Sequence, residues 1–427
     1  MNIKDNLQKI DKDHFQLLID IGDVAKKNNL KAYLVGGMVR DLLLGCDNLD
    51  IDITVENDSL KLADAIVKAF PNSKLSAKHD RFHTAKIIFD MNGQLIPVDL
   101  ASTREEIYKH PAALPDVRVS ELKKDLIRRD FTINALAVSL LPNDFGEVVD
   151  LFNGLDDLKN KKIRILHDKS FIDDPTRMIR AVRFAEKLDF EIEEKTNKLL
   201  KETIESKQFD NLIEEIRGDR VKIEIRYLFN LPNVEKAVKA FFESGICKMI
   251  SIRLEPCRGI ACYAPTNVNV RQWLITLALI LNDLDTEHQK KIMTNLQLTN
   301  DEIAIIEKGL SICKKFHQLI QDKIKLDSLV TYKTLSGLDI ESVFIIKSLF
   351  SASGKVVAFD NAKVLPFIDE YLEKTSKIKL EITGEDLIKI GIPEGKEIGK
   401  TLQKVLEKKI QNPSMKKEDE IREARQE

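Results

Sequence analysis

Residues 34–55, LVGGMVRDLLLGCDNLDIDITV, constrain the fold of this chain more than any other stretch. They predict a short apolar strand, a tight turn at Gly36 and Gly37, and an amphipathic helix. A second strand follows and carries Asp50 and Asp52. Strand, turn, helix and strand in this order predict an α+β unit near the start of the chain.

The two aspartates predict a metal site. Asp50 and Asp52 are two residues apart, so on a strand their side chains project from the same face. Two like charges this close repel unless a cation lies between them, and paired carboxylates suit Mg²⁺, which completes its shell with waters and substrate phosphates. The Gly36-Gly37 turn allows close approach of a phosphate and presents N–H groups at a helix N-terminus. The alternative is an acidic strand that faces solvent.

Gly-Gly, a helix and Asp-x-Asp together resemble the nucleotidyltransferase signature of the polymerase beta superfamily. The longer pattern GGMVRDLLLG…DIDITV resembles its tRNA nucleotidyltransferase and poly(A) polymerase branch of bacterial type. The resemblance implies that Asp50 and Asp52 hold Mg²⁺. It also implies that Gly36, Gly37 and Arg40 steady a nucleoside triphosphate.

Alternating residues between positions 74 and 102 predict further strands of the same sheet, with a hairpin turn at Asn92-Gly93. Asp99 ends the later strand and is a candidate third carboxylate of the catalytic group. A strand-end aspartate that faces solvent is the alternative. His83 stands where relatives tend to have the glycine of Phe-Gly-Thr.

Residues 104–119 contain two prolines and no clear period, which predicts a mobile loop. Residues 120–140 read as one helix, on which Arg128, Arg129 and Asp130 are consecutive, so at most two of them are expected to serve one site. LIRRDFTINALA resembles the second motif of the family, which implies that the arginines bind triphosphate and the aspartate binds a ribose hydroxyl. A solvated charged stripe is the alternative.

Residues 171–188, FIDDPTRMIRAVRFAEKL, predict one helix with Asp174 as N-cap and Pro175 in its first turn. Three arginines follow at a spacing of three and form a drifting row on one face: Arg177, Arg180 and Arg183. On local sequence alone, the aspartate only caps the helix and the first arginine only pairs with it.

The same helix resembles the template motif of the family, Glu-Asp-x-x-Arg, which here reads DDPTR. The resemblance implies that Asp174 and Arg177 select the nucleobase, because an acceptor and several donors can imitate a pairing partner. Asp173 replaces the glutamate. Arg180 completes the predicted nucleotide-binding set.

Helical patterns dominate from about residue 191 onward. Residues 381–410 predict two helices joined by the turn GIPEG, and this segment resembles the family's tail, which grips the tRNA elbow. The second helix carries lysines that attract a phosphate backbone: Lys400, Lys404, Lys408 and Lys409. An ordinary helical hairpin is the alternative, and the highly charged residues 412–427 are expected to be frayed.

A length of 427 residues exceeds one hydrophobic core and predicts two to four domains. The expected fold is an α+β nucleotidyltransferase head with a small mixed sheet, followed by an all-α neck, body and tail. The expected boundaries are 1–150, 151–230, 231–375 and 376–427. No apolar run suits a membrane span or a signal peptide, which predicts a cytoplasmic protein with no membrane partner.

Five scattered cysteines fit a reducing compartment, and Cys257 and Cys262 have no second ligand pair at zinc-site spacing. The net charge of −2 excludes a uniformly basic surface and leaves a basic cleft open.

The expected activity is template-independent addition of C and/or A to the 3′ end of tRNA from CTP and/or ATP, with release of pyrophosphate. The expected enzyme is a monomer or a homodimer. Addition of A alone, a poly(A) polymerase, and a non-catalytic RNA-binding protein of the same fold are the alternatives.

Overall fold

The computed structural model describes residues 1–46, 48–91, 93–113, 115–206, 209, 218–249, 270–351 and 363–426. The chain forms two compact units, Met1–Glu224 with Ala240–Ile252, and Ile225–Lys239 with Arg253–Glu427. The division into head, neck, body and tail stays a prediction. Asn92, Cys257 and Cys262 lie outside the described residues.

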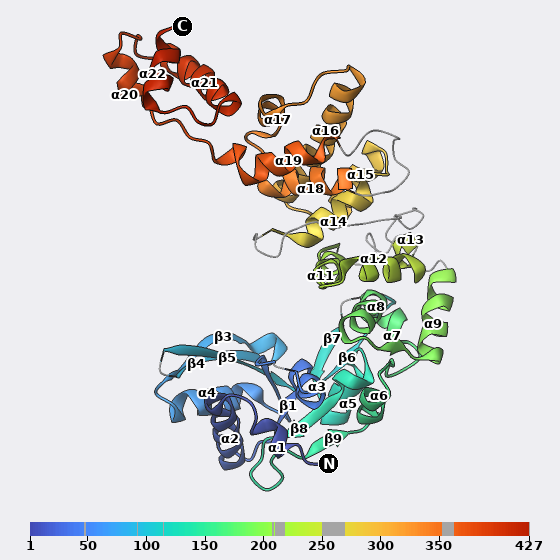
Figure 1. The fold of residues 1–427 in the computed structure, drawn as a ribbon. Helices are drawn as coiled ribbons and strands as arrows, with labels where there is room; N and C mark the ends of the chain where they lie inside the picture. The colour runs from blue at the N-terminus through green and yellow to red at the C-terminus, as the bar shows by residue number, and fades with distance from the viewer. Residues whose placement is uncertain are drawn as a thin grey trace. The chain divides into compact units, whose positions relative to one another are not determined.

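A seven-stranded sheet organises the first unit, in the order β3-β4-β5-β2-β1-β8-β9 (Figure 1). Neighbours β2 and β5 are parallel and the other neighbouring pairs are antiparallel, which confirms the predicted mixed sheet. The strands are β1 Ala32–Val35, β2 Ile51–Val55, β3 Ser73–His79, β4 Thr84–Met91, β5 Gln94–Ser102, β8 Leu136–Ser139 and β9 Val148–Asp150.

One face of strands β3 to β5 is covered and the other is open. Helix α4 (Ser59–Ala69) packs against these strands, and α2 (Lys12–Lys27) packs against α4 (Figure 1). Along β5, Ile96, Val98 and Leu100 are buried, whereas the alternate residues face outward. This period of two places Asp99 on the open face. The short helix α1 (Lys4–Leu7) precedes α2.

The glycine turn leads from β1 into α3 (Gly37–Leu44), as predicted. The single helix predicted over residues 120–140 is wrong. The segment forms α5 (Leu122–Ile127), a 3₁₀ turn and strand β8 beside β1. All four residues of β8 are buried, and a short apolar run of this kind fits a central strand as well as a helix.

The mobile loop predicted over residues 104–119 is also wrong. Strands β6 (Arg104–Ile107) and β7 (Asp116–Val119) pair as an antiparallel hairpin. Ion pairs attach it to α5 and the residues beyond, because Lys124 lies 2.7 Å from Glu105 and Arg128 lies 2.9 Å from Glu106.

Short helices follow the sheet in the first unit. The predicted helix over residues 171–188 is divided into α7 (Ser170–Asp173) and α8 (Thr176–Leu188). The other elements here are α6 Gly154–Lys159, β10 Lys162–Ile163, β11 Glu191–Ile192, α9 Glu194–Glu205 and α13 Ile246–Met249. Helix α11 (Gly218–Phe229) belongs to the first unit up to Glu224, and α12 (Val234–Glu243) also crosses a unit boundary.

The second unit is helical in its described part. Helix α14 (Gln272–Leu281) is buried from Trp273 onward and packs against α16 and α18. The remaining helices of this part are α15 Thr286–Asn295, α16 Asn300–Gln321, α17 Ser328–Leu335, α18 Ile340–Ser351 and α19 Leu365–Glu373. Nowhere in the described residues is a helix both long enough and apolar enough to cross a membrane.

The last segment of the chain forms three helices, α20 (Gly384–Lys389), α21 (Lys396–Gln411) and α22 (Lys417–Arg425). The frayed terminus predicted for residues 412–427 is wrong in the described part. Glu420 of α22 is fully buried, pairs with Lys409 and accepts the backbone N–H of Ile382 at 2.9 Å. A buried carboxylate with these partners anchors α22 to the other two helices.

Candidate active site

Two carboxylates lie side by side on the open face of the sheet. Asp52 and Asp99 are register partners on the parallel strands β2 and β5, and neighbouring strands lie about 4.8 Å apart. Asp50 lies one residue before β2, so the prediction that it shares the strand with Asp52 is wrong. Its N–H donates to Asn48 Oδ1 at 3.0 Å. The structure therefore pairs Asp52 with Asp99 directly and places Asp50 at the edge of this group.

The electrostatics of this group are those of a cation site. Protein atoms around Asp52 withdraw hydration from its carboxylate although solvent still reaches it, and this raises its pKa above the ordinary value. The charges of Asp99 and Asp50 raise the pKa further, while Arg129 and Lys86 act in the opposite direction.

Lys86 already neutralises one member of the group. It faces Asp99 across the antiparallel pair β4–β5, and its Nζ donates to Asp99 Oδ2 at 3.0 Å. No three acidic, histidine or cysteine side chains of the described residues converge tightly enough to hold a metal alone. Mg²⁺ does not require such a cage, because it takes one or two carboxylates and completes its shell with water and phosphate. The donor set fits that ion.

Gly36 separates the carboxylates from the neighbouring cavity. Its φ of +77° lies in the left-handed region, and an added Cβ would lie 3.3 Å from Asp52 Oδ2 and 3.8 Å from Arg129 Nη1. A side chain here would crowd the carboxylate and strain the turn. The glycine predicted from sequence is therefore required by both conformation and space.

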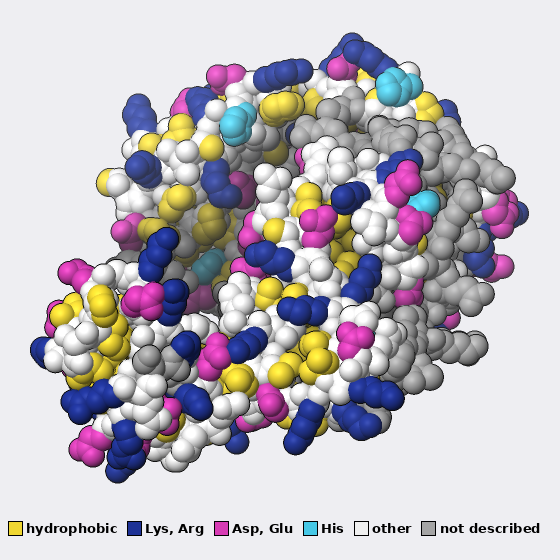
Figure 2. All heavy atoms as spheres, turned by 90° about the horizontal axis from the view of Figure 1, so that it is seen from above, with side chains coloured by type: hydrophobic (Ala, Val, Ile, Leu, Met, Phe, Trp, Pro, Cys, Tyr) yellow, Lys and Arg dark blue, Asp and Glu magenta, His cyan; other side chains and the backbone are white. Residues whose placement is uncertain are grey.

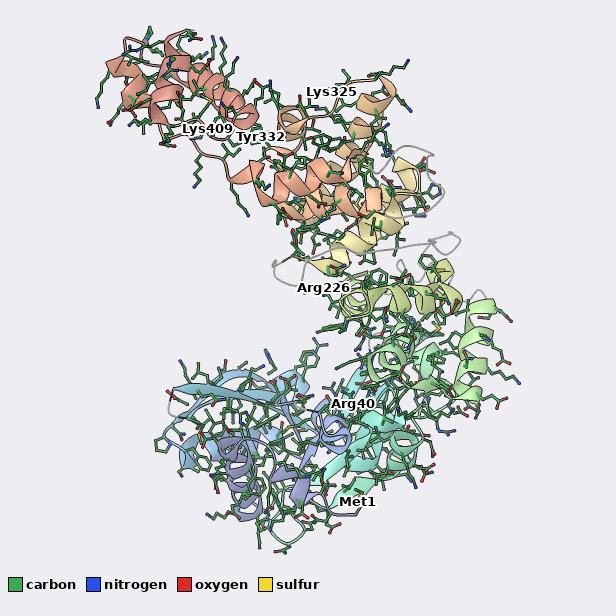
Figure 3. The ribbon with its side chains drawn as sticks, in the orientation of Figure 1. Met1, Arg40, Arg226, Lys325, Tyr332 and Lys409 are labelled. Carbon is green, nitrogen blue, oxygen red and sulfur yellow. The ribbon has the colours of Figure 1, made fainter. Side chains whose placement is uncertain are left out.

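Arg40 braces this turn from inside. It is 3% exposed, its Nε donates to Asp41 at 2.7 Å, and its Nη1 donates to Asn134 Oδ1 at 2.8 Å. Figure 3 labels Arg40 on α3. Because these donors are engaged with protein acceptors, the structure favours a bracing role.

A cavity of about 640 Å³ lies beside the turn. It is lined by eight basic and four acidic residues, an excess of positive charge that suits a triphosphate. The charged residues are Arg40, Arg128, Arg129, Arg177, Arg180, Arg183, Lys187 and Arg220, with Glu106, Asp130, Asp174 and Glu224.

The consecutive residues Arg128, Arg129 and Asp130 all line this cavity, so the prediction that at most two of them serve one site is wrong. Helix α5 ends at Ile127, and the next residues are not bound by helical spacing. Asp125 holds both arginines, since its Oδ1 accepts from Arg128 at 2.7 Å and its Oδ2 accepts from Arg129 at 3.2 Å.

Asp125 has a side chain that is only 1% exposed. Burial alone would raise the pKa of this carboxyl, but the charges and hydrogen bonds of Arg128 and Arg129 hold it below its usual range. Asp125 is therefore ionised and fixes the direction of both guanidinium groups.

Asp130 is the centre of a second buried network. Its Oδ1 accepts from Asn134 at 3.0 Å and its Oδ2 accepts from Arg180 at 2.9 Å. Arg180 also donates to Glu224 Oε1 at 3.0 Å, and Arg183 donates to Glu224 Oε2 at 2.9 Å. This network joins Asp130, which follows α5 in the chain, to α8 and α11.

Asp130 predicts an acid-sensitive contribution to stability. Burial would raise its pKa, but Arg180 and Asn134 lower it from 3.8 to about 2. Because the folded value is the lower one, the carboxylate contributes about 2 kcal/mol above pH 4, and this contribution disappears as the pH falls toward 2. We expect the stability gap between the wild type and Asp130→Asn to narrow from pH 5 to pH 3 in urea unfolding. A gap independent of pH would contradict the assignment.

Asp174 and Arg177 both line the cavity, each fixed by protein partners. Asp174 Oδ1 accepts the N–H of Thr176 at 3.1 Å, although the N-cap residue of α8 is Pro175 and not Asp174 as predicted. Arg177 is 5% exposed and donates to Ser170 Oγ at 2.8 Å and to the carbonyl of Arg128 at 2.6 Å. The two side chains are held apart from one another by these contacts, so the reading in which they only pair is not favoured.

Asp173 does not line the cavity and lies 3.9 Å from His167.

His83 has a φ of +48°, in the left-handed region. A glycine takes this conformation without strain, and histidine is one of the residues that tolerates it. The backbone carbonyl of His83 accepts from Ser59 Oγ at 2.6 Å and from the N–H of Ser102 at 3.0 Å. His83 is thus a turn residue, and the hydrogen bonds that its backbone carbonyl accepts hold it in place.

Several residues at this site were not predicted from sequence. They come from segments without a local signal, the hairpin and α11 above all: Glu106, Tyr108, Asp125, Asn134, Phe184, Arg220 and Glu224. Burial and the charge of Glu106 raise the pKa of Tyr108, whose hydroxyl donates to Glu106 at 2.8 Å. The carboxylate of Asp125, three residues before Arg128, was the one available signal, since that spacing allows an ion pair on a helix.

Two family models match the chain. Residues 32–164 match the poly(A) polymerase head domain, and residues 267–424 match tRNA nucleotidyltransferase domain 2. The chain is 32% identical to the A-adding tRNA nucleotidyltransferase of Geobacter sulfurreducens over 95% of its own length and 46% of that protein. It therefore spans about half the length of this relative. It is 29% identical to the CCA-adding enzyme of Lactobacillus helveticus, over 93% of this chain and 94% of that protein.

Solved structures agree with these matches. The CCA-adding enzyme of Thermotoga maritima complexed with tRNA is 30% identical, with a TM-score of 0.76 over 99% of this chain and 98% of that one. CCA-adding enzymes complexed with ATP and with CTP, also 30% identical, give TM-scores of 0.77 and 0.76 over 99% of this chain and 97% of theirs. The chain belongs to the tRNA nucleotidyltransferase and poly(A) polymerase family.

Proposed function

We propose that this protein adds C and/or A to the 3′ end of tRNA, from CTP and/or ATP, without a nucleic-acid template. The observation that carries the proposal is the arginine-lined cavity directly beside the paired carboxylates Asp52 and Asp99, with Gly36 between them. Nucleotidyl transfer needs both a positively charged pocket for the triphosphate and catalytic carboxylates next to it. The solved relatives that hold tRNA, ATP and CTP support the same substrates.

Nucleotidyltransferases of this family generally use a divalent metal, and we propose Mg²⁺. Asp52 and Asp99 would hold it, with Asp50 at the edge of the group. A bound Mg²⁺ would supply activation of the primer 3′-OH and neutralisation of the charge that develops on the α-phosphate and pyrophosphate. Lys86 keeps Asp99 compensated until the ion binds. The three carboxylates thus define where the primer end must lie.

The cavity orients the nucleotide. Arg128 and Arg129, held by Asp125, direct guanidinium groups toward the triphosphate, and a planar fork matches phosphate oxygens. Gly36 and Gly37 let the backbone approach the phosphates. Asp130 is available to a ribose hydroxyl only as part of its network with Arg180.

Base choice follows from donor and acceptor chemistry. Cytosine and adenine carry an exocyclic amino group where uracil and guanine carry a carbonyl oxygen. The carboxylate oxygens of Asp174 accept a hydrogen bond from that amino group and repel a carbonyl, and Arg177 donates to the ring nitrogen beside it. The cavity therefore favours CTP and ATP over UTP and GTP.

Helix α21 supplies a surface for the RNA backbone. Its exposed lysines recur every four residues and form one row: Lys396, Lys400, Lys404 and Lys408. Lys409, predicted to share this surface, is buried against Glu420 instead. Figure 2 shows basic and acidic side chains interspersed over the face in view. Attraction to phosphate is thus local to segments such as this row.

Addition of A alone is the second candidate, because the A-adding relative of Geobacter sulfurreducens is slightly more similar than the CCA-adding enzyme of Lactobacillus helveticus. We also propose that the protein acts in the cytoplasm as a monomer or homodimer.

Incubation with tRNA transcripts that end before CCA, after the first C or after CC, with each labelled NTP, tests these proposals. CCA addition predicts incorporation on all three transcripts. A-only addition predicts labelled AMP on the CC transcript alone, and a poly(A) polymerase extends any of them. No incorporation would leave the non-catalytic reading.

A further inference from the structure

The carboxylate of Asp174 is held from two sides. Oδ1 accepts the N–H of Thr176 at 3.1 Å and its hydroxyl at 2.6 Å. Oδ2 accepts Nη2 of Arg220 at 2.6 Å. Thr176 is a neighbour in sequence, whereas Arg220 lies 46 residues away on α11. The contact with Thr176 is therefore local in sequence, whereas the contact with Arg220 forms only when the unit folds.

Arg220 belongs to the cavity wall. It lines the cavity with Asp174 and Arg177, and its side chain is 31% exposed against 16% for Asp174. A charge-assisted hydrogen bond in this partly buried setting holds the aspartate side chain in one rotamer. Arg177 takes no part in this pairing, since it donates to Ser170 and to the carbonyl of Arg128.

We propose that Arg220 is a positioning residue for nucleobase choice, acting through Asp174. With Oδ2 bound to Arg220 and Oδ1 bound to Thr176, the carboxylate presents only its remaining lone pairs to the base. Without Arg220, only the contacts with Thr176 fix the carboxylate, so it can turn away from the exocyclic amino group of cytosine or adenine and its preference for these bases over uracil and guanine weakens. The inference rests on the proposed function, in which Asp174 reads the base.

The test measures incorporation of the four nucleotides by the full-length protein. CTP and UTP are compared on a tRNA transcript whose next nucleotide is C, and ATP and GTP on one whose next nucleotide is A. The measured quantities are kcat/KM for CTP over UTP and for ATP over GTP. We expect Arg220→Gln to lower both ratios by about tenfold. Lys187→Gln is the matched control, because Lys187 is a cation of the same cavity wall. It is expected to lower kcat/KM for all four nucleotides by a common factor and to leave the ratios unchanged.

A double-mutant cycle separates positioning from general charge. Asp174→Ala should abolish the preference, and adding Arg220→Gln to it should change the ratios no further. Arg220→Lys keeps the charge without the planar fork and should give intermediate ratios, which serves if the glutamine variant fails to fold. Wild-type ratios in both Arg220 variants, or independent effects in the cycle, would overturn the inference. A wild type that adds neither C nor A would instead refute the proposed function.

Discussion

Asp52→Ala is expected to reduce incorporation of labelled CMP or AMP by at least about a hundredfold. Asp52 faces Asp99 across the parallel pair, and protein atoms together with two other carboxylates raise its pKa. Its removal deletes a principal ligand of the proposed Mg²⁺ and the group nearest to Gly36. The triphosphate arginines keep their partners, so nucleotide binding should largely survive.

The measurement is single-turnover incorporation, paired with equilibrium binding of ATP. Asp64→Ala is the control, because it removes a carboxylate from α4 whose partner Lys78 is on the surface. That variant should retain wild-type incorporation. Near-normal incorporation by Asp52→Ala would contradict the assignment of Asp52 as a metal ligand. Loss of both ATP binding and incorporation would indicate a folding defect.

The catalytic half of the site could be predicted because its residues are close in sequence. Gly36, Gly37 and Asp52 lie in one strand, turn, helix and strand, so local spacing determines where they point. Asp99 was predicted as a strand-end candidate, and the register places it opposite Asp52. Asp50 was misplaced by one residue, which is the usual uncertainty of a strand boundary.

The nucleotide cavity could be predicted only in part, because the positions of its side chains depend on partners that are distant in sequence. Arg128 and Arg129 share the cavity with Asp130 only because α5 stops at Ile127, and no capping signal announces that end. Arg220, which binds Asp174 from α11, comes from a helix whose sequence reads as an ordinary surface pattern. A sequence shows which residues are charged and at what spacing they recur, whereas the pairing of these charges depends on tertiary contacts.

Buried residues account for the other errors. Leu136–Ser139 was predicted as helix, and its four buried residues form a strand beside β1. The charged C-terminal segment was predicted to fray, but Glu420 finds Lys409 and two backbone N–H groups in the interior. A charge pattern cannot distinguish a solvated side chain from one whose partner is supplied by another helix.

Asp125→Ala is expected to have the largest effect among residues that touch no substrate. Its buried carboxylate accepts from Arg128 and Arg129 and from the backbone N–H of Arg104 at 3.2 Å. Removing it leaves two partly buried cations without their shared anion, which should cost about 3 kcal/mol in stability. Both guanidinium groups would also leave the positions that face the triphosphate, and displacements of about 1 Å can cost a hundredfold in rate.

We therefore expect kcat/KM to fall by about a hundredfold for every nucleotide, with the ratios between nucleotides unchanged. This outcome separates Asp125, which orients triphosphate contacts, from Arg220, which is proposed to affect base choice. Glu121→Gln is the matched control, because Glu121 is an exposed carboxylate at the start of the same helix and its side chain caps nothing there. Steady-state kinetics and thermal unfolding of both variants provide the measurement. If Asp125→Ala kept wild-type kcat/KM while losing stability, Arg128 and Arg129 would not contact the triphosphate, and the electrostatic account of the cavity would need other residues.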